Sequence, residues 1–124
     1  MNMSKLTSKC LVSFVLLMLF GFATSARATT YDWLSFIGGS GSDNGYGITH
    51  DTSGNVYLTG VSTATWGSPI REYTAGNDVF VAKFNSSGAL VWNTFLGGSG
   101  VDEGCSIVID SSGNIYINAK STAT

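Results

Sequence analysis

The feature that most constrains this chain is an internal repeat with a period of 59 residues. Residues 33–65 and 92–124 align without a gap, and 18 of the 33 positions are identical. Many of the substitutions between the two copies are mild, such as Ile37 to Leu96. A unit that recurs at a fixed period predicts a repeat architecture, in which each unit buries its apolar surface against its neighbours.

One period contains four predicted β-strands joined mostly by tight turns. The expected strands are residues 45–51, 56–59, 78–84 and 89–96. A longer loop, residues 62–77, holds the only proline of the chain, Pro69. Residues 31–37 match the fourth strand of the period, so a strand is expected there as well.

The predicted strands are apolar on both faces. In residues 78–84, one face carries Val79 and Val81, and the other carries Phe80, Ala82 and Phe84. In the fourth strand, Leu90 is expected on the face of Trp92, opposite Phe95. A sheet wetted on one side would alternate apolar and polar residues. An all-β fold of four-stranded antiparallel β-propeller blades is therefore predicted.

Three runs of the repeat carry a resemblance to a known family. They are Trp-x-x-Phe-Leu/Ile-Gly-Gly-Ser-Gly, Asp-x-Ser-Gly-Asn-Val/Ile-Tyr, and Asp-Val-Phe-Val-Ala-Lys-Phe-Asn at residues 78–85. They resemble the SBBP family of bacterial β-propeller repeats, which is named for a seven-bladed propeller. The resemblance covers essentially all of residues 31–124, and the loop at residues 66–69 also matches. It implies an extracytoplasmic protein of tandem blades, with no common enzymatic activity and no catalytic residues.

Residues 1–28 are expected to be a signal peptide. Lys5 and Lys9 precede an apolar run of 13 residues, 11–23, and Ala26-Arg27-Ala28 supplies a small-x-small cleavage site. A membrane-spanning helix needs about 20 apolar residues, so a retained anchor is the less favoured alternative. Cleavage before Thr29 predicts a secreted or cell-surface protein, and the family resemblance implies that the cell surface is bacterial.

The remaining β-propeller repeat region, residues 29–124, does not complete a ring. It holds one complete repeat, 33–91, and a partial repeat, 92–124, or about 1.6 blades where a closed propeller has about four to eight. Three arrangements stay open. The chain is a truncated segment of a longer propeller whose missing part is C-terminal, several copies assemble into a ring, or the strands form a small β-sandwich.

Charge and composition exclude several function classes. The net charge of the chain is −2. After removal of the leader, three basic and eight acidic residues remain, which gives a net charge of −5. This excludes the basic footprint of a nucleic-acid-binding protein. His50 is the only histidine, which excludes a multi-histidine metal site, and we expect it to be half-buried and structural. Cys105, left alone after leader cleavage, is expected to be a small buried apolar residue.

Four aspartates lie in motifs that resemble calcium loops. Two Gly-Gly-x-Gly-x-Asp runs end at Asp43 and Asp102, but calcium-binding β-rolls need such nonapeptides in direct succession. We expect these two carboxylates to bond local backbone amides. The Asp-x-Ser-Gly-Asn runs at Asp51 and Asp110 lack the acidic density of a calcium loop and are expected to be turns. No metal, cofactor-binding or catalytic residue is predicted.

Aromatic residues provide the remaining candidates. Trp33 and Trp92 occupy equivalent strand positions and are expected to pack. Trp66, Arg71 and Tyr73 lie in the long loop, where they could stack on a sugar or dock a peptide. The alternative is that this loop covers its own blade.

The predicted function is that of a secreted, non-catalytic β-propeller repeat segment, a scaffold or interaction module within a longer propeller. The alternative is a small self-assembling lectin-like protein that uses the loop aromatics Trp66 and Tyr73. The expected partners are neighbouring propeller blades, or further copies of the chain at the open blade faces, and a protein or carbohydrate ligand. No nucleic acid, and no membrane span after leader cleavage, is expected.

Overall fold

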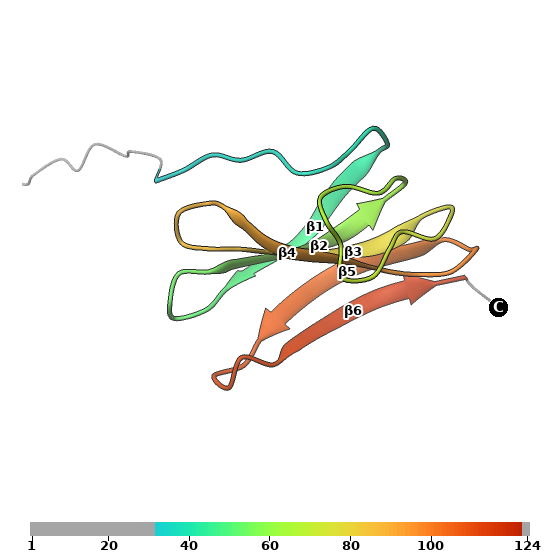
Figure 1. The fold of residues 1–124 in the computed structure, drawn as a ribbon. Coiled ribbons are helices and arrows are strands. Elements are labelled where there is room, and N and C mark those ends of the chain that lie inside the picture. Colours follow the sequence, from blue (N-terminus) through green and yellow to red (C-terminus); the bar gives the residue numbers. More distant parts are fainter. Residues whose placement is uncertain (1–31, 123–124) are drawn as a thin grey trace, which may run out of the picture. The chain divides into compact units, whose positions relative to one another are not determined.

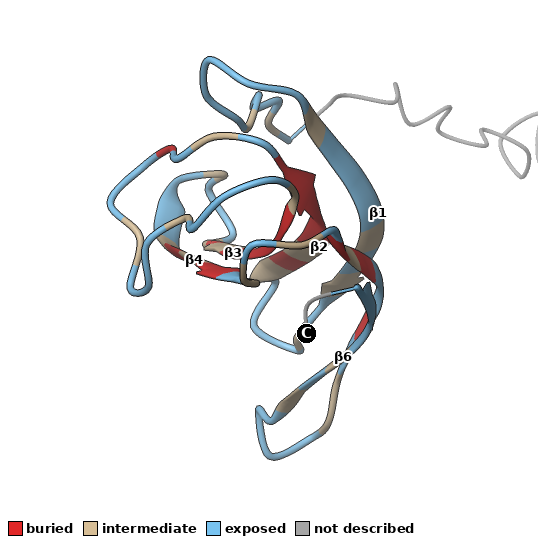
Figure 2. Ribbon diagram, turned by 90° about the vertical axis from the view of Figure 1, so that its right-hand side faces the viewer, coloured by how far each residue is buried: buried red, intermediate tan, exposed pale blue. Residues whose placement is uncertain are grey.

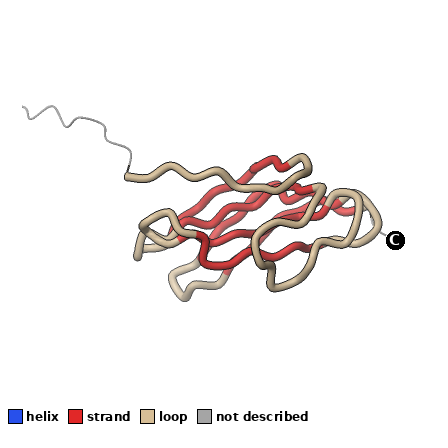
Figure 3. Tube along the Cα trace, turned by 45° about the horizontal axis from the view of Figure 1, so that its top comes forward, coloured by secondary structure: helices blue, strands red, loops and turns tan. Residues whose placement is uncertain are grey.

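Residues 32–122 are described by the computed structural model, and they form two antiparallel sheets. The first sheet has the order β1 (Asp43–His50), β2 (Val56–Ser62), β3 (Asp78–Phe84) and β4 (Leu90–Leu96). The second is the hairpin of β5 (Asp102–Ile109) and β6 (Ile115–Ser121). No helix occurs among these residues (Figure 3), which confirms the all-β class. The expected signal peptide lies outside the described residues.

The repeated sequence produces a repeated backbone. The turns of the β1–β2 and β5–β6 hairpins place Gly54 and Gly113 at φ values of 78° and 85°, the left-handed region that glycine enters without strain. The register also shifts at equivalent places, just after Gly45 in β1 and just after Gly104 in β5. The two hairpins are therefore copies of one supersecondary unit.

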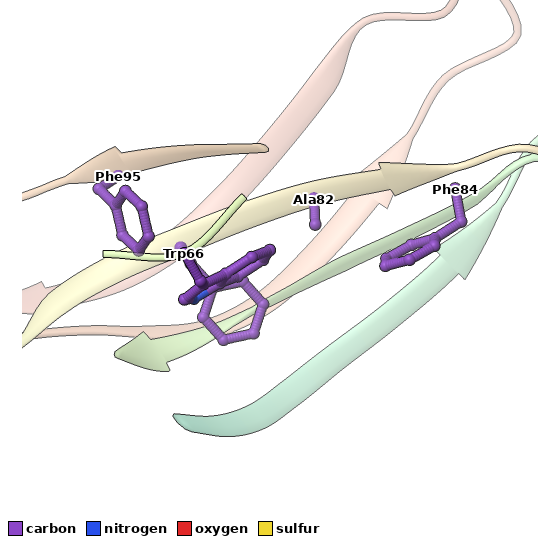
Figure 4. Packing of buried hydrophobic residues seen from close by; sticks show 5 residues of the cluster. Trp66, Ala82, Phe84 and Phe95 are labelled. Atoms are coloured by element: carbon purple, nitrogen blue, oxygen red, sulfur yellow. The ribbon is translucent and has the colours of Figure 1, made fainter. Parts of the chain in front are cut away.

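One face of the four-stranded sheet packs against the long loop. Its buried core consists of Trp66, Phe80, Ala82, Phe84 and Phe95 (Figure 4). The Trp66 ring meets Phe80 and Phe95 edge-to-face, with centroids 5.4 and 5.7 Å apart. The loop thus covers the part of this face around Phe80 and Phe95, while the Trp33 ring stacks on Phe84, with centroids 6.2 Å apart.

The opposite face of the same sheet is covered by the next hairpin. Strand β5 lies against β1, β2 and β3 (Figure 1). Tyr57 and Val81 of the first sheet and Ile107 of β5 form the buried centre of this joint, and Trp92 packs at its border. The described residues therefore form one complete blade and half of a second, a propeller-like but incomplete arrangement.

Two expectations about strands are wrong. Residues 32–37 form no strand. Their repeat counterpart, β4, pairs with β3, whereas no strand equivalent to β3 lies beside residues 32–37 in the described region. The register also shifts between Lys83 and Phe84, so Leu90 lies opposite Phe84. Leu90 is therefore on the face of Phe95 rather than on that of Trp92, because directly opposed residues share a face of the sheet.

Candidate functional site

In each Gly-Gly-x-Gly-x-Asp run, the aspartate side chain accepts a hydrogen bond from a backbone amide of the same run. Asp43 Oδ2 accepts the N–H of Gly39 at 2.9 Å, and Asp102 Oδ2 accepts the N–H of Gly98 at the same distance. The hydrogen bond from Ser121, followed by that from Gly98, lowers the pKa of Asp102 below its ordinary value. The expected bonding to local amides is confirmed. These carboxylates terminate a tight connection between blades.

In each Asp-x-Ser-Gly-Asn turn, the aspartate carboxylate accepts four hydrogen bonds, two on each oxygen. Asp51 Oδ1 accepts the N–H groups of Ser53 and Asn55, each at 2.9 Å. Its Oδ2 accepts the Asn55 side-chain amide at 2.7 Å and the Tyr57 hydroxyl at 3.0 Å. Asp110 accepts the four equivalent bonds in the second copy. The predicted role of both residues as turn residues is confirmed.

These bonds make the stability of the first turn depend on pH. Hydrogen bonds, the largest from the Asn55 side chain, lower the pKa of Asp51 from 3.8 to about 2. A carboxyl with a lowered folded-state pKa contributes stability above its ordinary pKa and loses it as the pH falls through the folded value. We expect Asp51→Asn to flatten the fall in melting temperature between about pH 4 and pH 2. The measurement is thermal denaturation of both proteins across this range.

Asn is a suitable replacement because the turn between β3 and β4 already has an asparagine, Asn85, in this role. Asn85 Oδ1 accepts the N–H groups of Ser87 and Ala89, as Asp51 Oδ1 does for Ser53 and Asn55. Equal acid sensitivity of the variant and the original chain would show that the charge of Asp51 makes no contribution.

The long loop is bound along the outer edge of its own blade. The N–H of Ile70 donates to the carbonyl of Asn93 at 2.8 Å, and the N–H of Phe95 donates to the carbonyl of Arg71 at 3.1 Å. The Arg71 guanidinium also donates to the carbonyl of Gly97 at 2.8 Å. An edge strand is thereby protected from pairing with another chain.

This placement decides the role of the loop aromatics. Trp66 is only 7% exposed, and its carbonyl accepts a hydrogen bond from the Asn93 side chain at 2.8 Å. Tyr73 packs edge-to-face on Phe95 and donates its hydroxyl to the carbonyl of Gly76. The loop covers its own blade, and both rings pack within it: Trp66 is buried and Tyr73 is half-buried.

Two sequence-based expectations about reactive residues are wrong. His50 is exposed, and its Nδ1 lies 3.1 Å from the carbonyl oxygen of Asp51. Cys105 is exposed as well, because it follows Gly104 at the register shift of β5. The counterpart of Cys105, Tyr46 of β1, is exposed for the same reason. Partial burial of His50 was expected from its repeat counterpart Ile109, and burial of Cys105 from the usual behaviour of a free cysteine.

Within residues 32–122, no three His, Cys, Asp or Glu side chains come together in a manner that would hold a metal ion. In the same residues, no helix is long and apolar enough to cross a membrane.

Sequence reasoning missed Asp78, which begins β3 and is fully buried. Its Oδ2 accepts the N–H of Thr74 at 2.7 Å, while Oδ1 lies beside Gly97 without a hydrogen-bond partner. A Cβ on Gly97 would meet both this oxygen and Asp102 Oδ2, at 2.4 and 2.8 Å. Gly97 thus allows the two carboxylates to approach the inter-blade connection. No signal in the repeat marks Asp78, since its counterpart falls outside the partial copy.

Two surfaces, one on β1 and one on β6, expose apolar residues whose repeat counterparts are buried. Ile48 is 69% exposed, whereas Ile107 is 5% exposed. Tyr116 is 56% exposed, whereas Tyr57 is 5% exposed. Figure 2 shows the same contrast between the buried central strands and the largely exposed β1 and β6. Unlike isolated surface apolar residues, these belong to a pattern that the chain buries elsewhere, which marks two candidate interaction surfaces.

The two packed sheets form a propeller-like but incomplete arrangement. Residues 32–65 match the family model of SBBP, a beta-propeller repeat. The match coincides with the first of the two aligned segments, residues 33–65, and confirms the resemblance noted in the sequence. No curated protein matches the chain.

Proposed function

We propose that this chain is a secreted, non-catalytic scaffold segment of a larger β-propeller, whose open blade faces are covered by further blades. The observation that carries the proposal is the exposure of Ile48 and Tyr116 where their counterparts, Ile107 and Tyr57, are buried in the joint between the blades. Repeat units gain most of their stability from such joints.

The polar groups of the described residues support a structural role. The aspartates of the turns and connections, Asp43, Asp51, Asp102 and Asp110, are all engaged by local donors. The one described histidine, His50, is exposed, and its Nδ1 lies 3.1 Å from the carbonyl oxygen of Asp51. Export of the chain follows from the proposed signal peptide, and the mass of the exported protein reports whether cleavage occurs before Thr29.

The chain offers a direct test, because residues 121–124 repeat residues 62–65. A second copy of residues 66–124, placed after Thr124, therefore continues the repeat in register. We expect this extension to raise the melting temperature, because it adds the missing strands and covers Tyr116. Each large apolar side chain that becomes fully buried contributes about 1.5–3 kcal/mol. The measurement is thermal and denaturant unfolding of both chains.

A matched control is an extension in which the added copy of Ile107 is replaced by lysine. This control has the same length, but its added joint lacks the central apolar contact. A melting temperature that is unchanged by the extension, or raised equally by the control, would contradict the assignment as a propeller segment. The lectin-like alternative has no specific observation in its favour, because the rings of Trp66 and Tyr73 are engaged within the blade.

A further inference from the structure

The joint between the two blades of this chain has a defined centre. Ile107 of β5 packs on Tyr57 and Val81 of the first sheet, and Trp92 of β4 borders the contact. The Tyr57 and Trp92 rings meet edge-to-face, with their centroids 6.5 Å apart. This is the one joint between repeat units that the described residues complete.

One half of an equivalent joint is open on the first blade. A groove of about 230 Å³ is lined by Trp33, Ile48, Val56 and Leu58, among others. Their repeat counterparts are Trp92, Ile107, Ile115 and Ile117. In the interior joint, the three isoleucines form the β5–β6 side and Trp92 of β4 packs beside them. The groove therefore has the apolar lining of the interior joint but lacks the tyrosine that the interior joint contains.

The other half is open on the second hairpin. Tyr116 is the counterpart of Tyr57, and its hydroxyl donates to Asp110 at 3.2 Å, as that of Tyr57 donates to Asp51 at 3.0 Å. The same bond thus holds both tyrosines in the orientation that the interior joint uses. Because Tyr116 is already fixed, little conformational freedom is lost when it becomes buried.

We propose that copies of this chain associate head to tail, with Tyr116 of one copy seated in the groove beside Ile48 and Trp33 of the next. The argument is continuity with the interior joint: the chain carries both halves of a contact that it already makes once. The proposal rests on the proposed function, since it treats the open faces as blade faces, and it names a second copy as their occupant. Contact between two different surfaces is heterologous, so it closes into a ring or extends as a filament.

The association joins sheet faces rather than strand edges, and its strength is expected to depend on protein concentration.

The test uses the exported chain and two variants, each of which blocks one half of the joint. Ile48→Lys charges the groove, and Tyr116→Lys removes the ring that enters it. Light scattering during size-exclusion chromatography is expected to show a molar mass above the monomer for the original chain and a monomer for each variant alone. A 1:1 mixture is expected to form dimers and nothing larger, because each pair keeps one intact groove and one intact tyrosine.

Ile70→Lys is the matched control, because Ile70 is an equally exposed isoleucine that lies on the loop and on neither open face. It is expected to leave the molar mass of the original chain unchanged. Circular dichroism checks the fold, and the milder Ile48→Ser and Tyr116→Ser replace any lysine variant that fails to fold. A monomeric original chain, or a mixture that stays monomeric, overturns the head-to-tail proposal. The extension experiment would still decide the propeller assignment, because its added blade is covalently attached.

Discussion

Replacing Phe95 with alanine is expected to cost about 3–5 kcal/mol of folding free energy, whereas the same change at Phe36 is expected to cost less than about 0.5 kcal/mol. The two residues are counterparts in the repeat. Phe95 is 0% exposed and packs against Trp66, Phe80 and Tyr73, while Phe36 is 92% exposed. Deleting a buried ring leaves a cavity, but deleting an exposed ring leaves none.

Urea unfolding of the two variants and the original chain measures this difference. Because the substitution is the same and the local sequences are similar, the comparison reports mainly the difference in burial of the two rings. A cost at Phe36 that equals the cost at Phe95 would show that residues 32–37 are covered in solution, and the exposed placement described above would then be wrong.

The second large effect is expected at the joint between the blades. A Cβ on Gly104 would meet Thr59 Oγ1 at 2.4 Å and Val79 Cγ1 at 2.9 Å, because β5 lies directly on the first sheet at this point. A Cβ on Gly45, its counterpart in β1, would meet nothing within 4 Å. We expect Gly104→Val to cost about 1–3 kcal/mol through overpacking, and Gly45→Val to have little effect.

Hydrogen exchange distinguishes this local effect from general destabilisation. In Gly104→Val, the amides of the β5–β6 hairpin should lose protection before those of β2 and β3, because the side chain forces the hairpin away from the sheet. Uniform loss of protection, or an equal cost at Gly45, would show that the hairpin and the sheet do not meet as two separate units.

Much of the local structure could be predicted because it depends on short-range chemistry. The turns at Asp51 and Asp110 were predicted correctly, since the acceptors and donors of each lie within six residues. The same holds for Asp43 and Asp102, which bond amides four residues away. These interactions follow from the order of residues alone and recur wherever the order recurs.

The errors have a different origin. Burial of His50 was expected from its counterpart Ile109 and burial of Cys105 from residue type, but exposure in β1 and β5 depends on the pairing and register shifts of each strand. Residues 32–37 have the sequence of a fourth strand but lack a third strand to pair with in the described region. The long loop could be read as a binding loop until its hydrogen bonds to β4 were known.

The repeat, the all-β class, the apolar character of both blade faces and the turns bonded by aspartates follow from the order of the residues. Which copy of each residue is buried follows from tertiary contacts instead. Tyr57 and Tyr116 have the same neighbours in sequence and the same hydroxyl bond, yet one is covered by β5 and the other faces solvent. Burial is a property of what stacks on a face, and in a repeat fold that partner lies one period away along the chain.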